Sequence, residues 1–299
     1  MIRPVRFGFN EQTAASNAFQ DAAMAHQPID QAQADAHREF DEMVRQLRAN
    51  GVDVMVYNDT PEPHTPDSIF PNNWVSFHYS GTVVLYPMQA ENRRLERRKD
   101  IIDDLSQRFH VSKVVDLTAY EDEGKYLEGT GSLVFDRMNR VAFACLSPRT
   151  NPEVLAEYSR RTGYQTVLFH AVDGTGKAVY HTNVLMCIGD SFAVVCLQAI
   201  QDLDERLMVR QKLEQLGKRI IEITIDQMNA FAGNMLLVQT TRGHKLLVMS
   251  KQAYNSLTDK QIDVLDDYAT LQTFDLATIE ANGGGSARCM MAEVHLPAK

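Results

Sequence analysis

The 299-residue sequence has few cysteines and no long hydrophobic run. No apolar stretch reaches the length that a membrane-spanning helix needs, and the N-terminal residues MIRPVRFGFNEQT form no apolar signal segment. The four cysteines, Cys145, Cys187, Cys196 and Cys289, make no CxxC pair and no spacing typical of a zinc site. We therefore expect a cytoplasmic protein in a reducing compartment, without a membrane partner, a metal or a cofactor.

The chain also lacks an excess of positive charge. Its formal net charge is -9, and its densest basic stretch, RRLERRK at 93–99, is interrupted by acid, so no nucleic-acid partner is expected. No segment rich in glycine, serine or proline separates two regions of different composition. The sequence therefore predicts a single domain over residues 1–299, and it leaves the oligomeric state open, with a homodimer as one expectation.

Five short segments share one pattern, in which a polar or glycine-containing start precedes an apolar run. They are NNWVSF, EGTGSLVF, HTNVLMCI, AGNMLLVQ and SARCMMAEV, which begin at residues 72, 128, 181, 232 and 286. Successive starts are 56, 53, 51 and 54 residues apart. We call these the anchor segments. Such a regular spacing indicates one structural unit repeated about five times.

Helices and strands are predicted between the anchor segments. Apolar residues at three- and four-residue steps predict helices at 37–51, 93–109, 151–163, 202–217 and 256–269. Short apolar runs predict buried strands at 52–57, 82–87, 165–170, 192–197 and 245–250. The repeated unit of strand, helix and strand predicts an α/β fold with near-radial repetition.

Polar side chains stand at the starts of the anchor segments. They are Asn72, Asn73, Glu128, His181, Asn183, Asn234, Arg288 and Cys289. Equivalent strands of a radial array begin at the same end of its axis, so these side chains are expected to meet. A thiol, an imidazole and a carboxylate at matched positions favour a nucleophile, an acid–base group and an orienting carboxylate. Taken singly, each has an ordinary structural explanation, because most free cysteines are small buried hydrophobes.

The order of these motifs resembles the guanidino-group-modifying superfamily of arginine deiminases, dimethylargininases and amidinotransferases, and in particular its citrulline-utilisation hydrolase-like branch. The similar stretches are PDSIFPNN at 66–73, LEGTG at 127–131, HTN at 181–183 and GGGSARC at 283–289. The resemblance spans nearly the whole chain. It implies a five-bladed α/β propeller, the pentein fold, and a small arginine-derived molecule as substrate.

The same resemblance implies a role for each matching residue. Cys289 is the nucleophile, His181 is the general acid and base, and Glu128 is its carboxylate partner. The substrate-binding set is Asp67, Phe70, Asn72, Asn73, Arg93, Arg94, Asn183 and Arg288. In that set Asp67 binds the reacting group beside Phe70, and one of Arg93 and Arg94 holds the substrate α-carboxylate.

Three of these positions depart from the superfamily pattern. The residues that match Asn72, Asn73 and Asn183 tend to be acidic in relatives that bind a guanidinium. An asparagine offers both a donor and an acceptor, which suits a neutral ureido group better than a cation. Asn is also common in turns, and Asp67 and Glu128 still leave two carboxylates for a guanidine.

We therefore expect a cysteine hydrolase that cleaves a C–N bond of an arginine-derived substrate, with citrulline favoured over arginine. The alternatives are an amidinotransferase that passes the carbon fragment to an amine, and a catalytically silent binding protein on the same fold.

Overall fold

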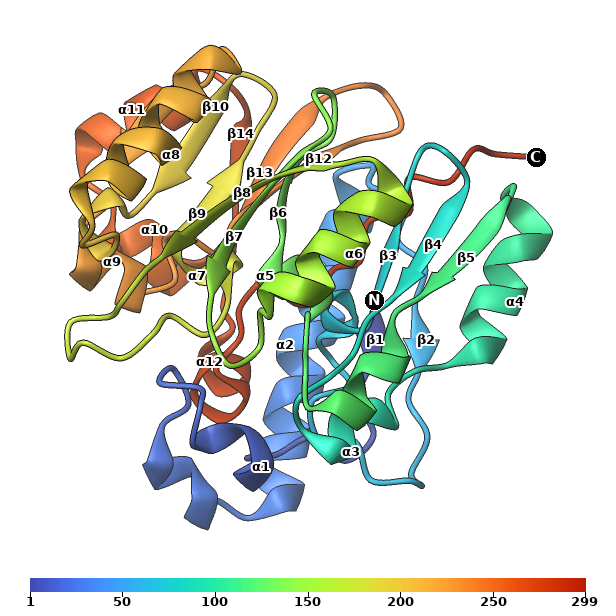
Figure 1. Cartoon of the computed structure of the whole chain (residues 1–299). Helices are drawn as coiled ribbons and strands as arrows, with labels where there is room; N and C mark the ends of the chain where they lie inside the picture. The colour runs from blue at the N-terminus through green and yellow to red at the C-terminus, as the bar shows by residue number, and fades with distance from the viewer.

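The computed structural model describes all of residues 1–299. It contains five small β-sheets with helices between their strands (Figure 1). Four of the sheets have three strands, in the orders β3-β4-β5, β6-β7-β8, β9-β10-β11 and β12-β13-β14. In each of them the first strand pairs antiparallel with the second, and the second pairs parallel with the third. The molecule is therefore a mixed α/β protein built on a repeated unit.

The strands of these sheets are short. They are β3 (Val75–Phe77), β4 (Thr82–Leu85), β5 (Lys113–Asp116), β6 (Val134–Asp136), β7 (Val141–Leu146), β8 (Gln165–His170), β9 (Met186–Ile188), β10 (Phe192–Val195), β11 (Arg219–Glu222), β12 (Leu236–Gln239), β13 (Lys245–Ser250) and β14 (Thr270–Phe274). The predicted strands at 82–87, 165–170, 192–197 and 245–250 are confirmed within a residue or two at their ends.

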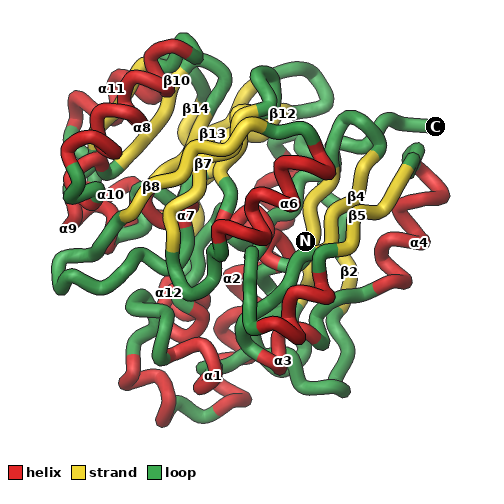
Figure 2. Tube along the Cα trace, in the orientation of Figure 1, coloured by secondary structure: helices red, strands yellow, loops and turns green.

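Helices join the parallel strands, as the sequence predicts. They are α4 (Lys99–Arg108), α6 (Pro152–Thr162), α8 (Leu203–Gln215), and the pair α10 (Lys251–Ser256) and α11 (Asp259–Asp266). The fifth sheet is smaller: β1 (Ile2–Arg3) and β2 (Tyr57–Asn58) pair in parallel, with α2 (Ile29–Ala49) between them in the chain. Helices α8 and α11 cover one side of the molecule and α4 covers another, outside the strands (Figure 2).

Helix α6 shows how local signals set the boundaries of these elements. The Asn151 side chain accepts hydrogen bonds from the Glu153 and Val154 amides, and Pro152 occupies the first turn. The helix ends at Gly163, whose φ of 73° lies in the left-handed region that glycine tolerates. These caps explain why the prediction for 151–163 is confirmed.

Three sequence predictions need correction. The helix predicted at 93–109 is broken into α3 (Glu91–Arg94) and α4, and Leu95 between them is exposed. The helix predicted at 37–51 begins eight residues earlier, at Ile29. The strand predicted at 52–57 is wrong except at its last residue, Tyr57, because β1 is only two residues long and offers no further partner.

Short helical turns precede the first strands of the sheets. These are η2 (Pro71–Asn73) before β3, α5 (Gly129–Ser132) before β6, α7 (Thr182–Leu185) before β9, and α9 (Ile225–Asn229) several residues before β12. The fifth anchor segment forms a turn over 287–290 and continues to 295 without a regular strand. The remaining elements are α1 (Glu11–Ala14), η1 (Ala22–His26), η3 (Thr118–Glu123), η4 (Leu197–Ala199) and α12 (Ala277–Gly283).

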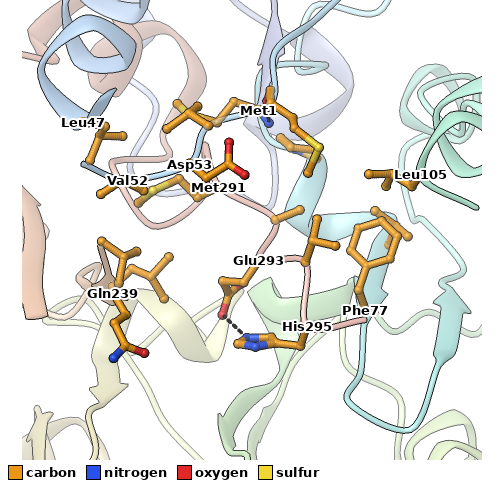
Figure 3. Close-up of a pocket in the computed structure, with 18 of the residues that line it drawn as sticks. Met1, Leu47, Val52, Asp53, Phe77, Leu105, Gln239, Met291, Glu293 and His295 are labelled. Carbon is orange, nitrogen blue, oxygen red and sulfur yellow. Dashed lines mark hydrogen bonds and ion pairs between the residues drawn. The ribbon is translucent and has the colours of Figure 1, made fainter. Parts of the chain in front are cut away.

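Beyond these turns, the first, fourth and fifth anchor segments line an apolar cavity of about 490 Å³. Its walls include β3, β12, residues 291–295 and the segment 52–55 that was expected to be a strand. Figure 3 shows Leu47, Val52 and Met291 on one side, with Phe77 and Leu105 on another. We call this the cavity end of the strands, and the end that carries Cys289 the thiol end.

None of the helices is both long and apolar enough to cross a bilayer.

Candidate active site

The thiol of Cys289 is buried and held by two side-chain amides. Its Sγ atom lies 3.4 Å from Asn183 Nδ2 and 3.3 Å from Asn234 Nδ2. The backbone N–H of Arg288 donates to Asn234 Oδ1 at 3.1 Å, which leaves the Nδ2 group of that amide to face the sulfur. A turn in which the Cys289 N–H donates to the Ser286 carbonyl at 2.9 Å presents the thiol to these amides.

The glycines that precede this turn are needed for close packing. A β-carbon added at Gly283 or Gly285 would lie within 3 Å of the Phe70 ring. Gly284 has a φ of 61° and packs against the Asn17 side chain. The run GGG therefore lets residues 283–289, which we call the nucleophile loop after the predicted role of Cys289, lie directly on an aromatic ring, a contact that any side chain would prevent.

His181 and Glu128 form a buried pair at the start of two neighbouring turns. His181 is the N-cap residue of α7 and Glu128 that of α5, and His181 Nε2 lies 2.8 Å from Glu128 Oε2. The other carboxylate oxygen accepts from the Gln89 N–H at 2.9 Å, and Arg149 Nη1 lies 3.4 Å from Oε2. The carboxylate thus fixes the imidazole from behind.

The pKa values of His181 and Glu128 are both lowered, but by different causes. Burial lowers the pKa of His181 to about 4, although its hydrogen bond with Glu128 opposes this shift. For Glu128, burial raises the pKa, but the charge of Arg149 and the hydrogen bond from His181 outweigh it and bring the pKa below its ordinary value. At neutral pH the imidazole is therefore neutral and the carboxylate is ionised.

Asn183 links the two halves of the site. It lies two residues after His181 in the same turn, and its amide donates to the sulfur of Cys289. The β-carbon that Gly131 lacks would lie 2.7 Å from the His181 ring and 2.5 Å from Asn73 Nδ2, so these two side chains flank the same glycine. The anchor segments therefore meet at the thiol end, as the sequence predicts.

Asp67 is a second buried carboxylate at this end. Its Oδ2 atom accepts from Asn10 Nδ2 at 2.7 Å and from the Thr13 hydroxyl at 3.4 Å, whereas Oδ1 has no hydrogen-bond partner. Burial raises the pKa of Asp67, and the charge of Arg93 opposes that shift. One carboxylate oxygen is thus left free to accept a hydrogen bond.

Arg93, Asn73 and Asn72 form a chain of hydrogen bonds. Arg93 Nη1 donates to Asn73 Oδ1 at 2.7 Å, and Asn73 Nδ2 donates to Asn72 Oδ1 at 3.2 Å. Asn72 Nδ2, at the end of the chain, is buried and has no partner. Arg93 is itself fixed by Glu96, which accepts from Nε at 2.8 Å and from Nη2 at 3.0 Å.

The other two arginines of the predicted binding set have partners elsewhere. Arg94 donates to the carbonyls of Met88 and Gln89 and lies 3.7 Å from Glu121. The Arg288 guanidinium donates to the Met291 carbonyl and pairs with Glu293 at 3.0 Å, toward the cavity end. The structure therefore groups only Arg93 of these three with the residues around the thiol.

Arg149 was missed by the sequence analysis and belongs to the site. It is almost fully buried, contacts Glu128, and lies over the Tyr180 ring at 4.9 Å. Its other donors reach only neutral acceptors, the Ser16 hydroxyl at 2.8 Å and the Thr13 carbonyl at 3.3 Å. The sequence SPRTNP around it carries no periodicity, and no local signal distinguishes it from a solvated loop arginine.

Residues 10–21 were also missed, although they cover the thiol end. The Asn17 amide donates to the Gly283 carbonyl at 3.2 Å and the Gln20 amide to the Asn282 carbonyl at 3.0 Å. Phe19 packs on Tyr180 with ring centroids 5.9 Å apart. In Figure 1 this segment, with α1, lies beside α12. It joins the nucleophile loop to the rest of the site.

The fold and this group of residues define a class of enzyme. A buried cysteine, a histidine paired with a glutamate, and five sheets, four of them built on one repeat, fit the pattern expected for the guanidino-group-modifying enzymes of pentein fold. The family model described as N,N dimethylarginine dimethylhydrolase, eukaryotic, matches residues 3–296, and the chain belongs to this family. A comparison with curated proteins found no match.

Solved structures share the fold at low sequence identity. The N-terminal domain of ArgZ, a cyanobacterial arginine dihydrolase, superposes with a TM-score of 0.74 at 17% identity, covering 99% of this chain and 98% of that domain. Unliganded AgrE gives 0.76 at 17% identity, covering 100% of this chain and 39% of AgrE. A dimethylarginine dimethylaminohydrolase adduct gives 0.62 at 18%, covering 86% and 90%. The chain spans only 42% of the whole ArgZ chain.

Proposed function

We propose that the protein is a cysteine-dependent hydrolase that cleaves a C–N bond at the ureido carbon of a citrulline-type amino acid through a covalent intermediate on Cys289. Family membership supports hydrolysis of an arginine-derived substrate, and the grouping of thiol, imidazole and carboxylate supports covalent catalysis. The similar ArgZ domain has been solved covalently bound to a reaction intermediate, which supports the same route here.

The choice of a ureido group rests on the unpaired donor at Asn72. A guanidinium side chain can only donate hydrogen bonds. Arg93 therefore requires Asn73 to accept through Oδ1 and to donate through Nδ2. Asn72 must then accept through its own Oδ1, and its Nδ2 group is left as a buried donor without an acceptor. A ureido carbonyl oxygen would satisfy this donor, whereas a guanidinium has no acceptor to offer.

The unpaired acceptors of the site do not distinguish a ureido group from a guanidinium. Asp67 Oδ1 and Asn183 Oδ1 are both buried and unpaired, and each can receive an N–H from a ureido group or from a guanidinium. Leaving a buried donor unpaired costs roughly 1 to 3 kcal/mol. The donor at Asn72 is therefore the group expected to set the preference between the two substrates.

The proposed reaction begins with proton transfer from the Cys289 thiol to neutral His181. The sulfur attacks the ureido carbon, and the bond from that carbon to the side-chain nitrogen breaks as His181 returns the proton to the nitrogen. Ornithine leaves, and a carbamoyl group stays on the sulfur. Water then loses a proton to His181 and attacks the carbonyl carbon, which breaks the S–C bond and restores the thiol. The carbamate product decomposes to carbon dioxide and ammonia.

The two buried arginines of the site would have separate tasks. Arg149 reaches only neutral acceptors besides Glu128, so a substrate carboxylate could replace Ser16 and Thr13 as its partner. Arg93 already holds a bidentate pair with Glu96, and it would orient Asn73 rather than bind the carboxylate. We therefore propose that the substrate α-carboxylate binds Arg149.

Arginine is the second candidate substrate. The unpaired oxygen of Asp67 offers a buried acceptor that a guanidinium could use, and the similar ArgZ domain belongs to an arginine dihydrolase. Two successive hydrolyses of arginine would also yield ornithine. Amidinotransfer and silent binding remain the weaker alternatives. That the five sheets close into a propeller, and that residues 1–299 form a single catalytic domain, also stay predictions.

The deciding experiment measures kcat/KM for citrulline and for arginine in the wild type, Asn73→Asp and the double variant Asn72→Glu with Asn73→Asp. A carboxylate at 73 cannot donate, so the Asn72 amide would turn and present its oxygen to the substrate. We expect the citrulline-to-arginine ratio to fall about tenfold or more, because 1.4 kcal/mol corresponds to one decade. Asn255→Asp, at an exposed position of α10, is the matched control.

A wild type that strongly prefers arginine would contradict the assignment of a ureido substrate. An unchanged ratio in Asn73→Asp would show that the hydrogen-bond chain from Arg93 does not select the substrate. Adding a primary amine to the assay separates hydrolysis from amidinotransfer, because only a transferase would yield a product that carries the amine.

A further inference from the structure

The carboxyl group of Glu280 lies beneath the nucleophile loop. Glu280 is on α12, is 3% exposed, and accepts a hydrogen bond of 2.5 Å from the Ser286 hydroxyl. Ser286 is fully buried, and its carbonyl accepts the Cys289 N–H that closes the turn around the thiol. The Glu280 carbonyl accepts from the Gly284 N–H at 2.8 Å. One residue therefore holds the loop at two points, through its side chain and its backbone.

No cation accompanies this carboxyl group. The charged groups that act on it are Glu39 of α2 and Asp275 before α12, both acidic, and Asp275 already pairs with Lys251 at 3.4 Å. Burial raises the pKa of Glu280 to about 7, the hydroxyls of Ser286 and Ser250 oppose the shift, and the two acidic neighbours add to it. A buried acid with no ion pair weakens the folded state when it ionises. Packing alone does not explain its presence here.

We infer that Glu280 is a positioning residue for the nucleophile, because its carboxyl group fixes Ser286 and through it the turn that aims the Cys289 sulfur at the amides of Asn183 and Asn234. This inference rests on the proposed role of Cys289. The carboxyl group touches neither the sulfur nor any residue that contacts it, so it acts through the geometry of the loop.

A merely structural role and a positioning role predict different results. If Glu280 only stabilised the fold, its removal would lower the melting temperature and affect catalysis only through the loss of folded protein. If it positions the loop, turnover falls by more than any loss of folded protein accounts for. The melting temperature then reports only the balance between losing a buried unpaired acid and leaving the Ser286 hydroxyl without its acceptor. Displacements of about 1 Å near reacting atoms can cost on the order of a hundredfold in rate.

The experiment compares Glu280→Ala, Glu280→Gln and Ser286→Ala with the wild type. We expect kcat to fall about 10- to 100-fold in Glu280→Ala and Ser286→Ala, with KM changed by less than about threefold. Glu280→Gln keeps an oxygen that can accept from Ser286 and should retain turnover within about threefold. Glu39→Gln is the matched control, because that carboxylate caps the amides of Thr278 and Ile279 on the same helix but does not contact the loop.

A second measurement needs no substrate. The rate at which iodoacetamide alkylates Cys289, followed by peptide mass analysis across pH 5 to 9, should change in Glu280→Ala and Ser286→Ala and stay as in the wild type in Glu39→Gln. Unchanged alkylation and unchanged kcat in both loop variants would overturn the inference, as would a turnover loss that only follows a lower melting temperature. An active Cys289→Ser would instead contradict the proposed function, and the alkylation comparison would still test the loop.

Discussion

The thiol end and the cavity end of strands β3 and β12 differ in what they leave unsatisfied. The cavity end holds about 490 Å³ of space, lined mainly by apolar side chains, with two ion pairs, Arg288 with Glu293 at 3.0 Å and Lys245 with Asp190 at 2.6 Å, and one buried ring nitrogen without a hydrogen bond, His295 Nε2. At the thiol end, three of the predicted site residues, Asp67, Asn72 and Asn183, each have a buried polar atom without a partner.

This contrast shows which property marks the site. A volume of 490 Å³ falls within the range of small-molecule pockets, so size alone would select the cavity end. Unpaired buried polar groups are rare in folded proteins and costly, so three of them around one thiol point to a ligand that supplies the missing hydrogen bonds. The thiol end is the candidate site because of its polarity and not because of its volume.

The largest expected effect compares two buried thiols, one at each end. Cys289→Ser and His181→Ala should each reduce turnover at least about a thousandfold, because groups that act as a unit fail together. Glu128→Gln should be severe but less complete. Cys187→Ser is the control: Cys187 lines a hollow of about 170 Å³ at the cavity end, and burial raises its pKa to about 12. Ornithine release measures all four, and a Cys289→Ser enzyme with a large share of activity would exclude the covalent route.

A second comparison uses two arginines. Arg149→Lys should raise KM about 10- to 100-fold, since a lysine cannot reproduce a bidentate contact with the substrate carboxylate. Arg288→Lys should leave KM within about threefold, because its partners are Met291 and Glu293. Equal losses in the two variants, measured by steady-state kinetics with verified folding, would mean that Arg288 also serves the substrate.

The pH dependence should report the buried imidazole. Because the pKa of His181 is lowered to about 4, activity should persist well below pH 6.5 and fall about tenfold per pH unit only below about pH 4, where the imidazole can no longer accept the thiol proton. Between pH 4 and 6.5 the unfolded chain binds more protons at this residue, so its contribution to stability grows as pH rises through that window. An acid limb of kcat/KM near 6.5 would contradict this environment.

The smallest expected effect on catalysis comes from the cavity end. Leu47 is fully buried and lines the cavity, so Leu47→Ala should lower the free energy of unfolding by about 2 to 5 kcal/mol. We expect kcat and KM of the folded variant to stay within about twofold of the wild type. Urea unfolding and kinetics on the same preparation check both. A catalytic defect without instability would show that the two ends are coupled.

Sequence patterns were sufficient where the determinants are local. The caps of α6, and the polar start and apolar run of each anchor segment, lie within a few residues of the features they specify. The sequence patterns gave a wrong prediction at 93–98, where Arg93 turns inward to Glu96 and Asp67, because periodicity assigns every charged residue to the solvent side. The strand predicted at 52–57 failed for the opposite reason, since its apolar residues face a cavity instead of a partner strand.

The thiol end was predicted only in part for a similar reason. Cys289, His181, Glu128 and the asparagines stand in recognisable motifs, and the structure brings them together. Arg149 gives no such signal, because its burial depends on Glu128, Ser16 and Tyr180, which lie far from it or in unrelated segments. The same holds for Glu280, which looks like one more surface acid of a helix until its contact with Ser286 is seen.

The contacts between residues 10–21 and 281–284 bear on when the thiol first finds its environment. Asn17 and Gly283, which meet above the loop, are 266 positions apart in the chain. Domains generally fold from the N-terminal side during synthesis, and contacts of long sequence separation form slowly. The polar groups of residues 10–21 therefore lack these partners until residues 281–284 have been made and have folded. Until residues 281–284 pack against residues 10–21, the thiol end is not covered. The Cys289 thiol of a newly made chain would therefore be accessible before the active site is complete.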